Sequence, residues 1–454
     1  MSKASNTKLS KPGTSAFKNI HPNAAGIDIG STEHYVAVPD CRDEQNVRVF
    51  GCLTPQLHEM AKWLKSCGIE TIAMESTGVY WVPIASVLEQ YGFDVQLVDA
   101  RHVKNVSGRK TDVQDCQWLQ QLHSFGLLRG AFRPDAEIGV LRTYWRHRQT
   151  LIEHVGQQVL RMQKALEQMN LQLHKVLSDI SGVTGMLILR AIAAGERDPV
   201  KLAQHKHALV KSSTETIAQA LTGNYRKDHV FVLCQALEVY DMFREKIEAC
   251  DKEIETHMAS FAPRKKQTTA PKPKPKTQKS RKNQAHFDLR SELYRMTGVD
   301  LTRIPGIDAL TAQAVVSEIG VDLSRFPSEK CFASWLALCP NPQITGGRVK
   351  RSKTRRSANR VAGALRVAAQ SLHKSQTAMG AFYRRMRGRL GAPKAITAAA
   401  HKLAILIYRL FKHGEDYIEK GLAAYEQAHK ERALKNLHRN AKSLGFTLVP
   451  ALVS

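Results

Sequence analysis

Acidic residues are scarce in this sequence, where 41 Asp and Glu face 67 Lys and Arg and leave a formal net charge of +26. A chain with so few compensating acids favours a polyanionic partner, because the phosphates that it neutralises release their counterions. Nucleic acid is therefore the expected partner. An acidic membrane surface, or a charge that only keeps the protein in solution, are the alternatives.

Paired cysteines and long apolar runs are missing as well. The eight cysteines are scattered without a Cys-x-x-Cys pair, so they indicate neither a zinc site nor a redox pair but reduced thiols of a cytosolic protein. The first 20 residues lack the apolar core of a secretion signal. The stretch "AITAAAHKLAILIYRLF" contains His401 and Lys402 and is too short to span a bilayer comfortably, so we expect a core helix and no membrane contact. The expected location is the bacterial cytoplasm, with nucleoid association when the protein is active.

The pattern along the chain predicts several regions, because 454 residues exceed one compact core. Residues 1–21 are predicted to be a disordered basic arm. In residues 22–136 the segments "GIDIG", "HYVAVPD" and "RVFGCL" indicate a β-meander. Helical and strand-like segments then alternate through "TPQLHEMAKWLKSCG", "IETIAME", "VYWVPIASVLEQYG" and "FDVQLVDA". Such an order is typical of a mixed α/β domain.

The second half is predicted to be mainly helical. In residues 137–261, Leu151, Val155, Leu160 and Met162 are placed near one stripe, and two long helices suggest an antiparallel coiled-coil arm. A plain helical scaffold and a role in dimerisation are equally open. Residues 262–286 form a Pro/Lys-rich linker that cannot build a core. Its basic residues, which have no acid among them, are Arg264, Lys265, Lys266, Lys272, Lys274, Lys276, Lys279, Arg281 and Lys282. Residues 287–430 are predicted to be a mostly helical domain and residues 431–454 a tail.

Carboxylates at unusual positions indicate a metal-binding catalytic site. Asp28 lies inside the apolar "GIDIG", Glu75 ends the apolar "TIAME", and Asp99 ends "VQLVD". Asp112 and Asp115 are three residues apart and would share one face of a helix. Magnesium prefers such oxygen ligands and is often shared with substrate phosphates. Two ions about 4 Å apart would stabilise both oxygens of a phosphodiester displacement.

Each acid also has a structural alternative. Asp28 would cap a turn, Glu75 would cap the next helix, Asp112 would be an N-cap, and Asp115 would be a first-turn acid favoured by the helix dipole. The segment "GIDIGST" also resembles the first phosphate loop of the actin and sugar-kinase fold. That fold needs a second phosphate loop and a glycine-rich adenosine motif, and neither is found in the sequence.

Two motifs in the second half indicate contact with nucleic acid. "IPGIDALTAQAVVSEIG" matches a helix-hairpin-helix with Gly306 in its turn, a motif that offers backbone N–H groups to phosphates. An ordinary helical hairpin in a core is the alternative. Thr345 precedes two glycines on a predicted flexible loop, where its hydroxyl could attack a phosphodiester. Around it lies a basic run without acids: Arg348, Lys350, Arg351, Lys353, Arg355, Arg356, Arg360 and Arg366.

Taken together, these residues resemble the DEDD insertion-sequence transposases, whose members act as RNA-guided ("bridge RNA") serine recombinases. The resemblance covers nearly the whole chain. It rests on "GIDIGSTEHYVAV", "AMESTGVYWVPI", "VDARHVKNVSGRKTDVQDCQWL", "IPGIDALTAQAVVSEIG", "LALCPNPQITGGRVKRSKTRRSANRVAGALRVAAQSL" and "GAFYRRMRGRLGAPKAITAAAHKLAILIY".

The resemblance implies an RNase H-fold, RuvC-like domain whose DEDD tetrad is Asp28, Glu75, Asp112 and Asp115. It leaves Asp99 without a role. It further implies one or two Mg²⁺ ions, a guide RNA that pairs with donor and target DNA, and a homo-oligomer, a dimer or tetramer. In such assemblies the serine of one protomer joins the metal site of another and bonds covalently to a DNA phosphate.

The chain departs from the family at this nucleophile, because Thr345 occupies the position of the serine. Threonine keeps the hydroxyl on a stiffer side chain. Thr345 is therefore the predicted nucleophile, and Ser352 and Ser357 are nearby substitutes that do not precede glycine. A copy that threonine makes slow or inactive is the alternative. The predicted function is metal-dependent, RNA-guided DNA strand exchange. A RuvC-like nuclease that cuts DNA by hydrolysis and a non-catalytic nucleic-acid binder are the alternatives.

Overall fold

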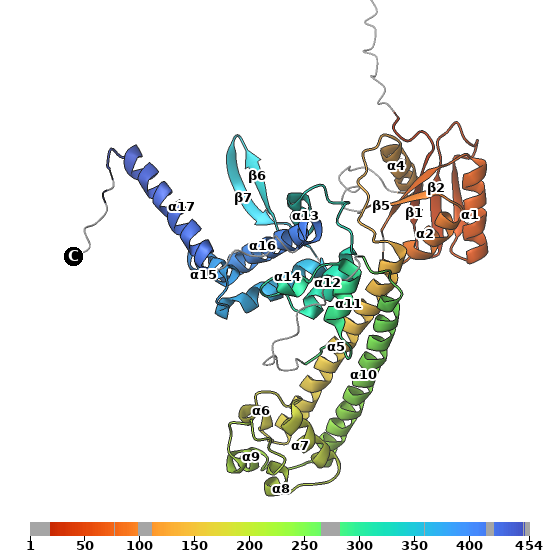
Figure 1. The fold of residues 1–454 in the computed structure, drawn as a ribbon. Helices are drawn as coiled ribbons and strands as arrows, with labels where there is room; N and C mark the ends of the chain where they lie inside the picture. Colours follow the sequence, from red (N-terminus) through yellow and green to blue (C-terminus); the bar gives the residue numbers. More distant parts are fainter. Residues whose placement is uncertain are drawn as a thin grey trace, which may run out of the picture. The chain divides into compact units, whose positions relative to one another are not determined.

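The computed structural model describes residues 19–76, 78–98, 111–264, 282–357, 359–414, 422–447 and 449 (Figure 1). The chain divides into two compact units, Met1–Arg133 and Pro134–Ser454. Asp99, most of the predicted arm and most of the predicted linker fall outside the described residues.

The first unit is built on a five-stranded sheet with the order β3-β2-β1-β4-β5. β1, β2 and β3 are an antiparallel meander, and β4 and β5 extend the sheet in parallel with β1. The mixed α/β domain is therefore confirmed, and its strand order is consistent with a RuvC-like fold. In chain order the elements are β1 (Ala24–Ile29), β2 (Glu33–Ala37), β3 (Val47–Gly51), α1 (Thr54–Ser66), β4 (Thr71–Glu75), α2 (Trp81–Gln90), β5 (Asp94–Val98) and α4 (Asp112–Ser124).

The two faces of β1 pack against different parts of the first unit. Ala25, Ile27 and Ile29 join the main apolar core together with buried side chains of α1 and α2. Because successive side chains of a strand alternate between faces, Gly26 and Asp28 point to the other side of the sheet. Helix α4 covers that side (Figure 1).

Helix α4 is fixed to the sheet by buried polar contacts at its C-terminal end. Gln120 Nε2 donates to the backbone oxygen of Ala24 at 3.3 Å, and His123 Nε2 lies 2.9 Å from Thr71 Oγ1. Burial, with the charge of the stacked His21 ring as the second cause, lowers the pKa of His123 to about 4. The ring is therefore neutral at pH 7 and serves as an uncharged anchor.

The second unit begins with a long helical hairpin. Its elements are α5 (Ala136–Gln168), α6 (Leu173–Val176), α7 (Val183–Ala193), α8 (Pro199–Ala203), α9 (Thr214–Ala220) and α10 (Lys227–Ala259). Helices α5 and α10 lie side by side (Figure 1), and they are antiparallel, because His257 contacts Glu137 near one end while His154 stacks on Phe243 further along. Whether their packing is that of a regular coiled coil stays a prediction.

One member of the predicted apolar stripe on α5 is wrong. Leu151, Val155 and Met162 are buried, but the side chain of Leu160 is 66% exposed. Buried positions along this helix mostly advance by three or four residues, and residue 160, two residues from the buried Gln158 and Met162, lies on the opposite side of the helix.

The rest of the second unit is mostly helical, as expected. It comprises α11 (Leu289–Thr297), the 3₁₀ turn η1 (Leu301–Arg303), α12 (Ala309–Ile319), α13 (Glu329–Trp335), β6 (Pro340–Thr345), β7 (Arg348–Thr354), α14 (Arg360–Ser371), η2 (Leu372–Lys374), α15 (Ala378–Leu390), α16 (Ala392–His413) and α17 (Leu422–Ser443). The predicted flexible loop around Thr345 is instead a two-stranded antiparallel hairpin, β6–β7. Within the described residues, no helix is both long and apolar enough to cross a membrane.

Candidate active site

Asp28 lies on the α4 face of β1, and Gly26 is the reason that α4 comes so near. A Cβ atom at residue 26 would overlap the backbone of Cys116 and Gln120 in α4. Only a residue without a side chain admits this approach. Since Asp28 is two residues further along the same face, its carboxylate meets the N-terminal part of the helix. Asp28 remains inside the ladder, opposite Tyr35, so it does not cap a turn.

Asp112 and Asp115 lie in the first turn of α4. Thr111 is the N-cap, since its hydroxyl accepts a hydrogen bond from the Gln114 backbone, which corrects the alternative that Asp112 is the cap. The positive end of the helix dipole favours acids at these positions. Asp112 is exposed and Asp115 half-buried, so both are open to a solvent-borne ligand.

Glu75 reaches the same region from the neighbouring strand. β4 runs parallel to β1, with Ile27 paired to Met74, so that Glu75 and Asp28 both come next after that pair. The following helix α2 has Tyr80 as its N-cap, and Glu75 therefore does not cap it.

The electrostatics of Asp28 show that these acids gather. The pKa of Asp28 is raised to about 6, first by burial and then by the charges of Asp112 and Asp115. Glu75 acts in the same direction, less strongly. Burial and then the charge of Asp28 also raise the pKa of the Cys116 thiol to about 12, which leaves this cysteine a neutral neighbour. The structure thus brings together all four predicted tetrad acids.

The oxygen atoms of these acids suit a hard cation, but the side chains do not form a complete set of metal ligands. Their oxygens are the donors that magnesium prefers, and mutual repulsion raises the cost of keeping them charged without a cation. Yet within the described ranges no group of three or more Asp, Glu, His or Cys side chains could hold a metal ion as it stands. The metal site therefore stays a prediction.

Thr345 lies in the second unit, at the end of β6. Gly346 and Gly347 form the hairpin turn, with φ of +56° and +74°, and Thr345 pairs with Arg348 across it. Positive φ at both turn positions is characteristic of a tight type I′ turn, which glycine adopts without steric cost. The side chain of Thr345 is exposed, so its hydroxyl is accessible at the tip of an ordered hairpin.

The predicted cations have different surroundings. Arg348, Lys350, Arg351 and Lys353 are exposed on β7. Arg356 is exposed in the segment after β7. Arg355 donates to the Ser334 backbone oxygen at 2.7 Å.

Arg360 and Glu318 show that one predicted DNA contact also has a partner within the protein. Arg360 lies 4.0 Å from the buried Glu318. Glu318 accepts hydrogen bonds from Arg142 and Arg146 of α5 at 2.7–2.8 Å. Although burial alone would raise the pKa of Glu318, these two arginines hold it below its ordinary value.

Gly306 occupies the turn between η1 and α12, as the motif predicts. Its φ is +89°, and a Cβ there would meet the Ala368 backbone oxygen and Leu372 at 3.1 Å. The turn therefore packs against the end of α14, and Gly306 also lines a pocket of about 390 Å³ together with Arg290 and Asp308. Phosphate binding by this turn is untested and stays a prediction.

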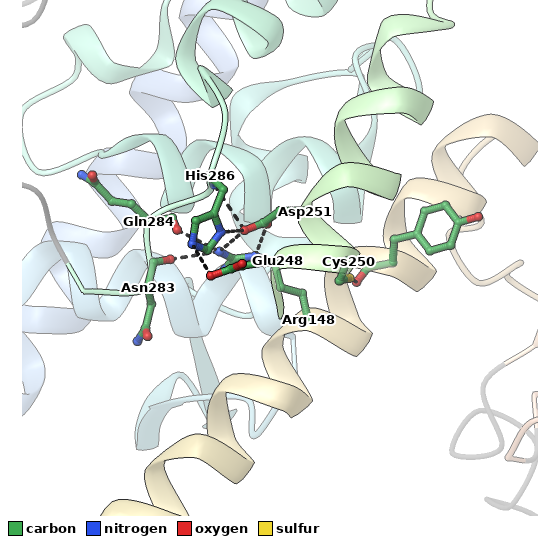
Figure 2. A network of polar contacts seen from close by, with 8 residues as sticks. Arg148, Glu248, Cys250, Asp251, Asn283, Gln284 and His286 are labelled. Atoms are coloured by element: carbon green, nitrogen blue, oxygen red, sulfur yellow. Dashed lines mark hydrogen bonds and ion pairs between the residues drawn. The ribbon is translucent and has the colours of Figure 1, made fainter. Parts of the chain in front are cut away.

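A buried charge network outside the predicted site was missed (Figure 2). Arg148 of α5 and Asp251 of α10 are fully buried and joined by hydrogen bonds of 2.5 and 3.1 Å. Arg148 also donates to the backbone oxygens of Asn283 and Gln284, while His286 Nδ1 lies 2.8 Å from Asp251. The network fastens the C-terminal end of the predicted linker to both long helices. The only signal in the sequence is a charge at an apolar position of each helix.

Comparison with known families assigns the chain. Residues 25–171 match the DEDD IS110 transposase model, and residues 300–384 match a model described as transposase IS116/IS110/IS902 family. Together the two matches cover just over half of the chain. The chain belongs to the IS110 family of DEDD transposases. No curated protein matches it.

The two matches contain the sites just described. The four acids of this IS110-family protein lie within the first matched segment, and Gly306 and Thr345 lie within the second. Transposases rearrange DNA, so the protein is a DNA transposase and DNA is its partner, as the excess of positive charge predicts.

Proposed function

We propose that this transposase moves its insertion sequence by magnesium-dependent, RNA-guided DNA strand exchange through a covalent bond between Thr345 and a DNA phosphate. The observation that carries the proposal is the gathering of Asp112, Asp115 and Glu75 around Asp28 in the segment that matches the DEDD transposase model. The exposed Thr345 hydroxyl beside Arg348 adds the second chemical group.

Asp28, Glu75, Asp112 and Asp115 are the residues that would hold magnesium. One or two ions bound there would stabilise the charge that develops on the phosphate during displacement. Asp28 is half-buried and held by a strand, while Asp112 and Asp115 begin a helix fixed by Gly26 and Gln120. The strand and the anchored helix therefore limit how far these carboxylates would have to move to bind an ion, which lowers the cost of reorganisation.

In the covalent step, Thr345 Oγ1 attacks the phosphorus of a DNA phosphodiester. A bond forms between this oxygen and phosphorus, and the bond from phosphorus to one deoxyribose oxygen breaks. The threonine proton passes to a base, and the leaving oxygen takes up a proton. A deoxyribose hydroxyl of another strand then reverses the step, which releases Thr345 and joins the new pair of strands. The number of phosphodiester bonds is unchanged, so no external energy source is needed.

Selection of the DNA is assigned to a guide RNA that pairs with donor and target strands. The cations around Thr345 would contact phosphates of either nucleic acid without reading its sequence. A dimer or tetramer of the chain would supply the several active centres that an exchange of strands requires.

A covalent-trapping experiment tests the proposal. The full-length protein is mixed with RNA transcribed from the flank of its gene, magnesium and DNA that carries the element junction, and is then denatured. We expect a protein–DNA adduct that maps to Thr345. It should disappear in Thr345→Val, which keeps the branched shape but lacks the hydroxyl, and in Asp112→Asn, which keeps the size but lacks the charge.

The outcomes separate the three candidate functions. Cleavage without an adduct, lost in Asp112→Asn and kept in Thr345→Val, would establish a hydrolytic nuclease, a function that the four acids could perform within the first unit alone. Binding without any cleavage in the wild type and in Thr345→Ser would leave a nucleic-acid binder. An adduct in Thr345→Ser alone would show that this copy of the enzyme is disabled at its nucleophile. An adduct that forms without RNA would refute the requirement for a guide RNA.

A further inference from the structure

The β6–β7 hairpin is irregular at one point. Thr345 pairs with Arg348 and Ile344 with Val349, but the next pair is Gln343 with Arg351. Lys350 is thus an extra residue on β7 without a paired partner in the ladder, which is a β-bulge.

This bulge determines which side chains share a face of the hairpin. Directly paired residues of antiparallel strands lie on the same face, and alternate residues of β6 do so too. Asn341, Gln343 and Thr345 therefore form one face of β6, and their pairing partners on β7 join them. The partners of this face, which we call the threonine face, are Lys353, Arg351 and Arg348.

The opposite face carries no cation from the paired positions. It comprises the following pairs, all of which lie in the exposed hairpin: Pro340 with Thr354, Pro342 with Ser352, and Ile344 with Val349. Side chains of Ile344 and Val349 are 60% and 59% exposed. Ser352 lies on this uncharged face, away from the three cations, which argues against it as a substitute for Thr345.

A regular ladder would not produce this arrangement. If Lys350 were paired with Gln343, Arg351 would face Pro342 and Lys353 would face Pro340. Arg351 and Lys353 would then lie on the side away from Thr345, because a shift of one residue moves side chains to the other face. The bulge therefore collects three of the exposed cations of β7 beside the candidate nucleophile.

We infer that the bulge makes the threonine face a cradle for the DNA backbone, in which Arg351 and Lys353 bind phosphates next to the one attacked by Thr345. Arg348 lies directly across from Thr345, with Cα atoms about 5 Å apart in such pairs. Arg351 and Lys353 then extend the row along β7 by about 7 Å, which is two residues of a strand. They act as positioning residues. This inference rests on the proposed function, since it gives the DNA strand its path across Thr345.

A variant that rearranges residues of β7 without changing their composition tests this inference. The variant R351S/S352R/K353T/T354K contains the same amino acids as the wild type but moves both cations to the opposite face. The control R351K/K353R exchanges the two cations within the threonine face. A further variant deletes Lys350, which removes the bulge and one exposed cation but leaves the pairs on either side of it, and hence Arg348, Arg351 and Lys353, with Thr345.

Two readouts separate this inference from the proposed function. The first is the salt dependence of binding to duplex DNA with the element junction, which needs no covalent chemistry. The slope of log K against log salt should fall by about 2 in the face-exchanged variant, because each lost phosphate contact contributes about 0.9. The second readout is adduct formation, which should fall at least tenfold in that variant. R351K/K353R keeps both charges on the threonine face and should keep most of the slope and of the adduct yield. Deletion of Lys350 should lower the slope by no more than the about 0.9 of its own charge, and thermal unfolding should match the wild type in all three variants.

Several results would overturn the inference. Wild-type slope and trapping in the face-exchanged variant would show that the position of the cations is irrelevant. Equal loss in the Lys350 deletion would assign the effect to the shape of the bulge. A changed slope for guide RNA with an unchanged slope for DNA would mean that the face binds RNA. A last outcome separates the two proposals. If neither the wild type nor any variant forms an adduct, while the salt slope falls as expected in the face-exchanged variant, phosphate binding by the threonine face is supported and covalent catalysis by Thr345 is refuted.

Discussion

At the scale of single residues, the site depends on a glycine as much as on its acids. Gly26 and Asp28 point to the same side of β1, and the lack of a side chain at residue 26 lets α4 bring Asp112 and Asp115 close to Asp28. The spacing of the carboxylates is therefore set by close backbone packing, which a single methyl group would disturb.

We predict that Gly26→Ala impairs catalysis more than DNA binding. The added methyl would overlap backbone atoms of Cys116 and Gln120, which cannot turn aside as a side chain does, so α4 must shift. Overpacking of this kind costs about 1–3 kcal/mol of folding free energy. Strand cleavage should fall at least tenfold while DNA affinity changes less than twofold, as measured by gel assays of cleavage and by fluorescence anisotropy.

The matched control is Gly156→Ala in α5. Nothing lies within 4 Å of a Cβ at this helical position, so alanine should stabilise the protein by about 0.5–1 kcal/mol. Wild-type cleavage by Gly26→Ala would contradict the role of close packing.

At the scale of elements, the α5–α10 pair depends on a buried charge pair as well as on its apolar residues. Arg148 and Asp251 are 0% and 1% exposed, respectively, and Asp251 also contacts His286 (Figure 2). Charges so far from solvent are stable only while each has its partner. The pair therefore couples the helices to the segment at residues 283–286.

We predict that Asp251→Ala destabilises this region strongly, because Arg148 would be left charged and buried. Breaking such a pair costs about 3–5 kcal/mol, whereas replacing both partners with apolar residues is often neutral. Asp251→Ala should lower the melting temperature and increase hydrogen exchange in α5 and α10, and R148M/D251L should restore most of both.

The exposed pair of Arg226 and Asp228 gives the comparison for this prediction. These side chains are 62% and 55% exposed, so Asp228→Ala should leave the melting temperature almost unchanged, because exposed ion pairs contribute little to stability. Equal effects of Asp228→Ala and Asp251→Ala would show that burial does not matter here.

These elements also show how far sequence reasoning reaches. Asp28 and Glu75 were identifiable because a carboxylate in an apolar strand is a local anomaly, and the strands and long helices followed from periodicity. The contact of Arg148 with Asp251 joins residues 103 positions apart, which no local pattern reveals. The β6–β7 hairpin was missed because its strands are exposed on both faces and lack the apolar alternation that marks a strand.

At the scale of the whole molecule, the positive charge is unevenly divided. Residues 1–133 contain 14 Lys and Arg and 13 Asp and Glu, while residues 134–454 contain 53 and 28. Nearly all of the net charge of +26 therefore belongs to the second unit, and residues 330–414 contain no acid at all. The nearly neutral first unit can gather carboxylates, while the second unit supplies the attraction for DNA.

This division predicts where substitutions weaken DNA binding. Arg387 and Arg389, at the end of α15, are exposed within the acid-free stretch, whereas Arg384 in the same helix donates to backbone oxygens of His373 and Ser375. R387Q/R389Q should reduce the slope of log K against log salt by about 2, at about 0.9 for each lost phosphate contact.

The control for this prediction removes the same charge from the balanced unit. Lys62 and Arg129 are exposed in residues 1–133, and K62Q/R129Q should leave the slope within error of the wild type. If both double variants lowered the slope equally, net charge alone would govern binding, whatever its place in the chain. A loss confined to R387Q/R389Q would instead locate a DNA path over α15, since long-range attraction between exposed charges is screened within about 8 Å at physiological salt.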